Sequence, residues 1–331
     1  MEPPSQISCS GNCLVHLHSD AGKAWFQRHC PFPQYLGPDG IPRFLVIRGN
    51  NERKFLSAHE IHTFQFRSNI ATYERLYGIR VQNVGAIIPA SINPRQYQSQ
   101  LSAAAADAGV CIVLFIERSV LAASYYKSLS TPGHRTALVF ELGHHFLEIS
   151  LLTDDRGLNV KAAVSDMGCP LFNHVVSALS LRHGNGFTSD VDSFLKIRME
   201  CERAKDALCL GSGTVEVKFN LLGRETRMPI NREWLVRLNL DHLRSGIMRC
   251  LMEAGVRREA VNEVVLAGAS SNIPAVRRVL HEFFQRQPFR CNIDPAHLIE
   301  LSSRKCMGIV STTLNSPVIA LHAFNLGLHS L

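Results

Sequence analysis

The most informative segment of this chain is "ALVFELGHHFLEISLL", which runs from Ala137 to Leu152. Two apolar runs flank a turn that contains Gly143, and this pattern predicts a β-hairpin. A glycine turn with a carboxylate beside a buried strand can hold phosphate through its backbone N–H groups. Here the turn also carries His144 and His145, which place two imidazoles where a phosphate loop needs bare backbone. The hairpin therefore predicts the shape of a phosphate loop without its usual chemistry.

Strands and helices alternate on both sides of this hairpin. Such an order indicates an α/β layered sheet. The apolar and turn patterns predict strands at Cys13–His18, Lys23–Arg28, Phe44–Ile47, Asn83–Pro89, Val110–Ile116, Val160–Val164 and Val264–Ala267, and a β-meander over 214–230. They predict helices at His59–Tyr77, from 91 to Gly109, and at Glu117–Lys127, Leu171–Leu181, Asp190–Cys209, Arg232–Gly255, Ala275–Gln285 and Pro295–Thr313.

The composition is that of an ordinary water-soluble protein rather than a membrane or nucleic-acid-binding protein. The 331 residues are 46% hydrophobic and 19% charged, and no apolar run approaches the roughly 18 residues of a membrane span. The net charge of +7 is dispersed, so we expect contact with nucleic acid only indirectly. The ten cysteines include no C-x-x-C pair, which favours reduced thiols. We therefore expect an intracellular, cytoplasmic protein, cytoskeletal and ciliary assemblies included, with organellar import left open.

Several motifs together resemble the ATPase domain of the seventy-kilodalton heat-shock chaperones, a member of the actin-like fold. The opening hairpin resembles the family's second phosphate loop, D-L-G-G-G-T-F-D. "ECERAKDALCL" (Glu200–Leu210) resembles its adenosine-side helix, and "VVLAGASSNIPAVRRVLHEFF" (Val264–Phe284) resembles its adenosine motif. "IERSVLAASYY" stands where the family has N-E-P-T-A-A-A. The resemblance covers residues 81–313 best, and it implies a two-lobed α/β actin-like ATPase fold with the outer subdomain of the first lobe reduced.

The same resemblance implies the domain boundaries. The first lobe would span 1–130 and include a connecting helix at 117–127. The second lobe would span 131–292 with the β-meander and a helical arm, and a returning connecting helix would occupy 293–315. Residues 316–331 would form an apolar tail similar to the family's interdomain linker, with no substrate-binding domain after it.

The residues that would carry the family's chemistry are partly replaced. In the family, glycine loops hold the triphosphate, and acidic side chains arrange Mg²⁺ and its waters. The first loop aligns with 9–13 and lacks its aspartate, and no match to the catalytic lysine is found around Lys54. Arg118 stands in place of the family's proline. The candidates that remain are Glu117, Glu141 and Glu148 as catalytic acids, and Gly143, Glu202, Lys205, Gly268 and Ser270 as residual nucleotide-binding positions.

We expect from these losses a pseudo-ATPase, a non-hydrolysing structural or binding subunit of a larger protein assembly. No cofactor is expected, although weak ATP or ADP binding stays open. No metal site is expected either, because adjacent histidines on an extended turn point to opposite faces. The alternatives are a divergent slow ATPase that uses the three glutamates with Mg²⁺, and a co-chaperone-like regulator. The apolar tail, 318–328, is expected to be ordered along its own sheet or against a partner protein by strand addition.

Overall fold

The computed structural model describes residues 34–36, 42–47, 53–91, 94–127, 135–143, 147–155, 157–166, 170–184, 191–209, 213–221, 224–285 and 287–322. Several predicted features lie outside these residues. They are the strand pair Cys13–His18 and Lys23–Arg28, the turn histidines His144 and His145, and the last part of the tail, 323–331.

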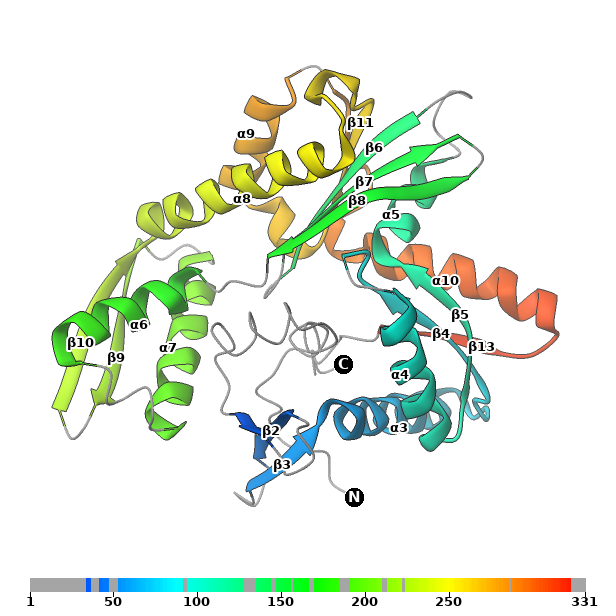
Figure 1. Ribbon diagram of the computed structural model, residues 1–331, viewed down its shortest axis with the longest axis horizontal. Coiled ribbons are helices and arrows are strands. Elements are labelled where there is room, and N and C mark those ends of the chain that lie inside the picture. The colour runs from blue at the N-terminus through cyan, green and yellow to red at the C-terminus, as the bar shows by residue number, and fades with distance from the viewer. Residues whose placement is uncertain are drawn as a thin grey trace.

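One lobe is built on a three-stranded parallel sheet in the order β13-β4-β5 (Figure 1). Its strands are β4 (Asn83–Ile88), β5 (Cys111–Glu117) and β13 (Val318–His322). Helices α3 (Ala58–Tyr77) and α4 (Pro94–Asp107) pack against it and close an apolar core. A separate antiparallel sheet of β1 (Gln34–Leu36), β2 (Pro42–Ile47) and β3 (Arg53–Ser57) leads into α3.

Local sequence signals explain where α3 begins and ends. Ser57 and Glu60 form a capping box, in which each side chain satisfies a backbone N–H of the other residue. Gly78 ends the helix with φ of 67°, a left-handed conformation that glycine adopts without strain.

The other lobe is built on a five-stranded mixed sheet in the order β12-β11-β6-β7-β8. The strands are β6 (Arg135–Leu142), β7 (Leu147–Asp154), β8 (Leu158–Asp166), β11 (Glu263–Ala267) and β12 (Phe289–Arg290). Side chains alternate between the two faces of each strand, so each face has its own helical cover. Helices α8 (Arg232–Ala254) and α9 (Pro274–Phe283) cover one face, and α5 (Arg118–Lys127) and α10 (Pro295–Leu314) cover the other.

A smaller helix-and-hairpin unit projects from this lobe, at the left of Figure 1. It consists of α6 (Pro170–His183), α7 (Val191–Cys209), β9 (Thr214–Leu221) and β10 (Arg224–Asn231), with its own apolar core. The predicted β-meander is wrong here, because β9 and β10 form a two-stranded hairpin. β9 and β10, with eight residues each, take up this segment on the two sides of its turn, so no third strand forms before α8. Asn231 caps α8 by accepting a hydrogen bond from the N–H of Trp234.

The helix expected to begin at Glu117 begins one residue later. Glu117 is still extended and is paired with Ile88 in the parallel register of β4 and β5, so Arg118 is the first helical residue. This shift matters because it places Arg118 at the junction between strand and helix. Two short 3₁₀ turns, Arg258–Ala260 and η4 (Ala269–Asn272), complete the elements.

The apolar tail is ordered along its own sheet as far as His322. Strand β13 pairs in parallel with β4, and Val318, Ile319 and Leu321 are buried. This confirms the first of the two expectations for residues 318–322. It also means that these three side chains are not available to a partner protein. Within the part of the chain that the structure describes, no helix is long and apolar enough to cross a membrane.

Candidate functional site

The β6–β7 hairpin brings two acidic candidates directly opposite each other. In its antiparallel register Glu141 pairs with Glu148, and the two side chains are 1% and 2% exposed. Two buried carboxylates this close need partners, because an uncompensated buried charge is strongly unfavourable. The structure supplies different partners for each.

Glu141 is neutralised by Arg118. The Arg118 Nε donates to both carboxylate oxygens, at 2.9 and 3.0 Å, and its Nη2 also contacts Oε1. The Arg118 side chain is itself only 12% exposed. This is a two-oxygen, charge-assisted contact that suits the planar fork of an arginine.

Glu148 is held by the chain that follows β4. Its Oε1 accepts from the N–H of Ala90 at 3.2 Å. Its Oε2 accepts from the N–H of Ser91 at 3.4 Å and from the Ser91 hydroxyl at 2.9 Å. The second carboxylate is thus bound by neutral donors rather than by a positive charge.

The different partners affect the protonation of the two groups. Burial opposes the charge on Arg118, but the adjacent Glu141 carboxylate and its hydrogen bonds raise the pKa of Arg118 above its usual value. Burial, followed by the negative charge of Glu141, raises the pKa of Glu148 to about 7. The hydrogen bonds from Ala90 and Ser91 and the charge of Arg118 act in the opposite direction without offsetting this. Glu148 therefore changes its charge near neutral pH.

Glu117, the third acidic candidate, does not contribute the contacts described above. It is half-buried at the end of β5, and it is the next residue, Arg118, that reaches Glu141. Sequence reasoning had noted Arg118 only as a replacement for proline and assigned it no role.

Gly143, which follows β6, lies close to Gly268, which links β11 to η4. We call this place the β11–η4 corner. Gly268 has φ of 79°, and a Cβ at this position would lie 2.3 Å from the carbonyl oxygen of Leu142 and 3.1 Å from the nitrogen of Gly143. The hydroxyl of Ser271 accepts from the N–H of Leu142 at 3.3 Å and also contacts the carbonyl of Ala267. Ser271, rather than the predicted Ser270, therefore connects this corner to the hairpin.

The remaining nucleotide-binding candidates belong to another element. Glu202 and Lys205 lie on α7, in the projecting unit, where Lys205 is half-buried and the side chain of Glu202 is outside the described residues. Asn272 donates to Asp294 at 2.7 Å and accepts from Arg277 at 2.7 Å. In this way it links η4 to the start of α10. No group of three or more metal-ligating side chains occurs in the described parts of the chain.

Two sheets joined by a pair of packed helices, with a β-hairpin facing the loop after β4, define the actin-like class of two-lobed ATPase folds. A family model described as Hsp70 protein matches residues 43–315. The chain belongs to the Hsp70 family.

Curated relatives agree with this assignment. The chain is 25% identical over 329 residues to the heat shock 70 kDa protein of Emericella nidulans, a match that covers 96% of this chain and 50% of that protein. It is 27% identical over 324 residues to heat shock 70 kDa protein 2 of Paracoccidioides lutzii, covering 94% and 49%. It is 29% identical over 259 residues to heat shock 70 kDa protein BIP3 of Oryza sativa subsp. japonica, covering 74% and 38%. The chain spans about half the length of the first two relatives.

Proposed function

We propose that this chain is a non-hydrolysing member of the Hsp70 family that acts as a structural or binding subunit of a larger protein assembly. The observation that carries the proposal is the contact of Arg118 with both carboxylate oxygens of Glu141. An arginine of the chain itself neutralises the acid that, by resemblance to the family, would arrange Mg²⁺.

A magnesium ion does not fit this arrangement. Mg²⁺ binds through carboxylate oxygens and ordered waters in a near-ideal octahedron. Here both oxygens of Glu141 already accept hydrogen bonds from a cation, and a second cation would have to displace the Arg118 guanidinium or lie beside it. Displacement would leave a largely buried arginine without its counter-charge, which is strongly unfavourable.

Glu148 is also a poor metal ligand in its present state. A pKa of about 7 means that near neutral pH a large fraction of its carboxyl groups are protonated. Hard cations prefer ionised carboxylates, and both oxygens of Glu148 already accept hydrogen bonds from Ala90 and Ser91. In the proposed function this site carries out no hydrolytic step.

The same contacts offer a structural role. Arg118 follows β5, and Ala90 and Ser91 follow β4, so all three partners come directly after strands of the three-stranded parallel sheet. Glu141 and Glu148 belong to the five-stranded sheet. The cluster of Arg118, Glu141, Glu148 and Ser91, which we call the interlobe clasp, joins the two lobes through side chains of the chain itself. In the proposed role the clasp holds the lobes together without a nucleotide.

The thiols fit an intracellular compartment, which is part of the proposal. Among the described residues, Cys111, Cys250, Cys291 and Cys306 carry free thiols. Burial raises the pKa of Cys250 to about 12, so this thiol stays protonated and unreactive.

Turnover of ATP by the purified chain tests the proposal. We expect phosphate release at the rate of the buffer alone, and no change with Glu117→Ala. The matched control is Glu253→Ala, which removes an exposed carboxylate from α8. Turnover well above background that disappears with Glu117→Ala but persists with Glu253→Ala would show that the chain is an ATPase.

A further inference from the structure

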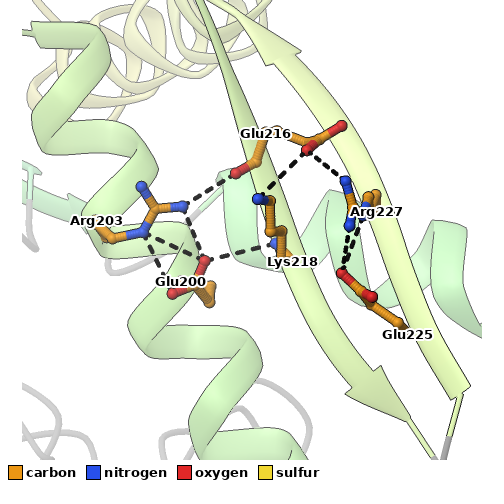
Figure 2. A network of polar contacts seen from close by, with 6 residues as sticks. All are labelled: Glu200, Arg203, Glu216, Lys218, Glu225 and Arg227. Atoms are coloured by element: carbon orange, nitrogen blue, oxygen red, sulfur yellow. Dashed lines mark hydrogen bonds and ion pairs between the residues drawn. The ribbon is translucent and has the colours of Figure 1, made fainter.

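The β9–β10 hairpin of the projecting unit has two edges, and side chains of α7 cover the edge formed by β9. The Nη2 of Arg203 donates to the carbonyl oxygen of Glu216 at 3.0 Å (Figure 2). The N–H of Lys218 donates to Oε2 of Glu200 at 3.5 Å. The backbone of Glu216 and Lys218 therefore points away from β10 and toward α7.

The register of the hairpin then fixes the direction of the β10 backbone. Two residues directly opposite each other in an antiparallel pair either exchange both backbone hydrogen bonds or exchange none. Glu216 lies opposite Pro229, and Lys218 lies opposite Arg227. Because Glu216 and Lys218 face away from β10, Pro229 and Arg227 face away from β9, which agrees with the missing N–H of Pro229. Glu225, two residues before Arg227, faces the same way.

The outer edge of β10 is unpaired. In the described residues β10 pairs only with β9, and no described group hydrogen-bonds to the outward backbone of Glu225 or Arg227. The side chains of these two residues are 58% and 54% exposed. An unpaired edge of this kind is a template for another strand. Pro229 lacks a donor at the far end of the edge, so the usable part is 224–228.

The charges along this edge define the strand that can be added. Arg227 contacts Glu225 at 2.9 Å and Glu216 at 3.6 Å, so the charges are balanced within one chain. A strand of a single sign would therefore meet repulsion as well as attraction. A strand that carries both signs in the reverse order meets an opposite charge at each position. The β10 strand of a second copy, running antiparallel, is such a strand.

One register of two β10 strands satisfies both the hydrogen bonds and the charges. Outward-facing residues must lie opposite outward-facing residues, so a two-fold axis passes through Glu225, Thr226 or Arg227. An axis at Glu225 or Arg227 would place like charges opposite each other, which is unfavourable. An axis at Thr226 places Glu225 opposite Arg227 of the second copy, and Arg227 opposite its Glu225. It also places the two Thr226 residues opposite each other, which is a favourable cross-strand pair.

We propose that two copies of the chain form a dimer by antiparallel addition of β10 to β10, with the two-fold axis at Thr226. The strands then form one continuous sheet in the order β9-β10-β10-β9. In this sheet Arg227, which lies opposite the like-charged Lys218 of β9, gains an acidic neighbour on its other side. The dimer needs neither a nucleotide nor the interlobe clasp, so it is independent of the proposed function.

Sedimentation equilibrium of the full chain over a range of concentrations measures the dimer. We expect a monomer–dimer equilibrium whose dissociation constant rises about tenfold or more with Arg227→Glu, because two glutamates then lie opposite each other. Glu225→Arg should weaken the dimer in the same way. An equal mixture of the two variants should restore it, since each supplies the sign that the other lacks. Arg304→Glu, at an exposed arginine of α10 that pairs with Glu300, is the matched control and should leave the dimer unchanged.

Disulfide cross-linking tests the register. In the proposed dimer the two Thr226 residues form a non-hydrogen-bonded pair, whose Cα atoms lie about 4.5 Å apart and within the span of a disulfide. Thr226→Cys should therefore give a covalent dimer after mild oxidation with diamide. Thr214→Cys, the same exchange at an exposed position of β9, should not. The natural chain, with its exposed Cys111, gives the background.

Three results would overturn the proposal. The first is a chain that stays monomeric at every concentration. The second is a dimer that Arg227→Glu and Arg304→Glu affect equally, or a mixture of the Arg227→Glu and Glu225→Arg variants that stays monomeric. The third is a dimer that Thr226→Cys does not cross-link, because the two β10 strands would then not meet at this residue.

Discussion

At the scale of single residues, Arg118 is the feature that separates this chain from the family pattern. The expected effect of Arg118→Ala is a loss of about 3–5 kcal/mol in the free energy of unfolding, because Glu141 is left buried beside Glu148 without a counter-charge. Denaturation by urea measures the change. Arg304→Ala, which removes an exposed arginine paired with Glu300, is the matched control and should cost no more than about 1 kcal/mol. Equal effects of the two substitutions would show that the clasp does not hold the fold.

Protonation of Glu148 makes the free energy of unfolding depend on pH. Its pKa of about 7 in the folded chain lies above the ordinary glutamate value of 4.5, so between these two pH values the folded state holds a proton that the unfolded state has released. Stability is therefore highest at the acidic end of this window and falls as the pH rises through 7, by up to roughly 3 kcal/mol. Glu148→Gln should remove this decline.

The measurement for Glu148 is the free energy of unfolding at pH 5, 6, 7 and 8 for both chains. The single amide oxygen of glutamine can replace only one of the two carboxylate oxygens that accept from Ala90 and Ser91, but that loss does not vary with pH, so the pH dependence of the difference isolates the charge. Glu253→Gln, at an exposed position, is the control. A difference between Glu148→Gln and the natural chain that stays constant with pH would contradict the account.

Sequence reasoning could place Glu141 and Glu148 in one hairpin, because the apolar alternation fixes the register. It could not identify the groups that neutralise them. Arg118 and Ser91 lie 23 and 57 residues away from their partners, and contacts of that kind depend on how the two sheets meet. The one signal in the sequence is Arg118, a charged residue that stands where the family has a proline and follows the candidate acid Glu117.

At the scale of elements, β13 shows how the apolar tail is stabilised. Ile319 and Leu321 pack into the core between β4, α3 and α4. Leu321→Ala should lower the free energy of unfolding by about 2–4 kcal/mol through lost burial and the resulting cavity. Leu314→Ala, at the exposed end of α10, should change it little. Hydrogen exchange provides the structural readout: the alternate amides of 318–322 that face β4 should be protected, and free exchange of all of them would contradict the assignment of this strand.

The β11–η4 corner depends on a glycine. Gly268→Ala should be destabilising by more than about 1 kcal/mol, because φ is 79° and the new Cβ would collide with the carbonyl of Leu142. Gly308→Ala is the matched control, since Gly308 is inside α10 and, apart from its neighbours and the backbone of its own helix, no atom lies within 4 Å of the added Cβ. Gly308→Ala should raise the free energy of unfolding slightly. The measurement is the midpoint temperature of thermal unfolding of the two variants. Similar shifts in both would contradict the close approach of Gly268 to Leu142.

Most elements could be predicted from apolar periodicity, and the differences have local causes. The sequence predicts a helix from Glu117, but the pairing of Glu117 with Ile88 keeps it in β5. The β-meander predicted over 214–230 is a two-stranded hairpin, because β9 and β10 take eight residues each and leave none for a third strand. The edge of β9 could not be predicted, since it depends on α7 side chains reaching the backbone of another element.

At the scale of the whole molecule, two kinds of connection join the lobes. Helices α5 and α10 pack against each other and on the five-stranded sheet, and α10 also contacts the three-stranded sheet, where a Cβ on Gly85 would meet the sulfur of Met307. The interlobe clasp adds charged and hydrogen-bonded contacts between the β6–β7 hairpin and the residues after β4 and β5. In our account, this second connection replaces the one that Mg²⁺ and nucleotide would otherwise make.

Calorimetric titration of the full chain with ATP, in the presence and absence of Mg²⁺, tests this claim most directly. The account predicts no saturable heat up to about 1 mM ATP, a binding free energy weaker than about −4 kcal/mol, and no difference between the two titrations. A dissociation constant of about 10 μM or below that requires Mg²⁺ would contradict it, because the ion would then have displaced Arg118 from Glu141.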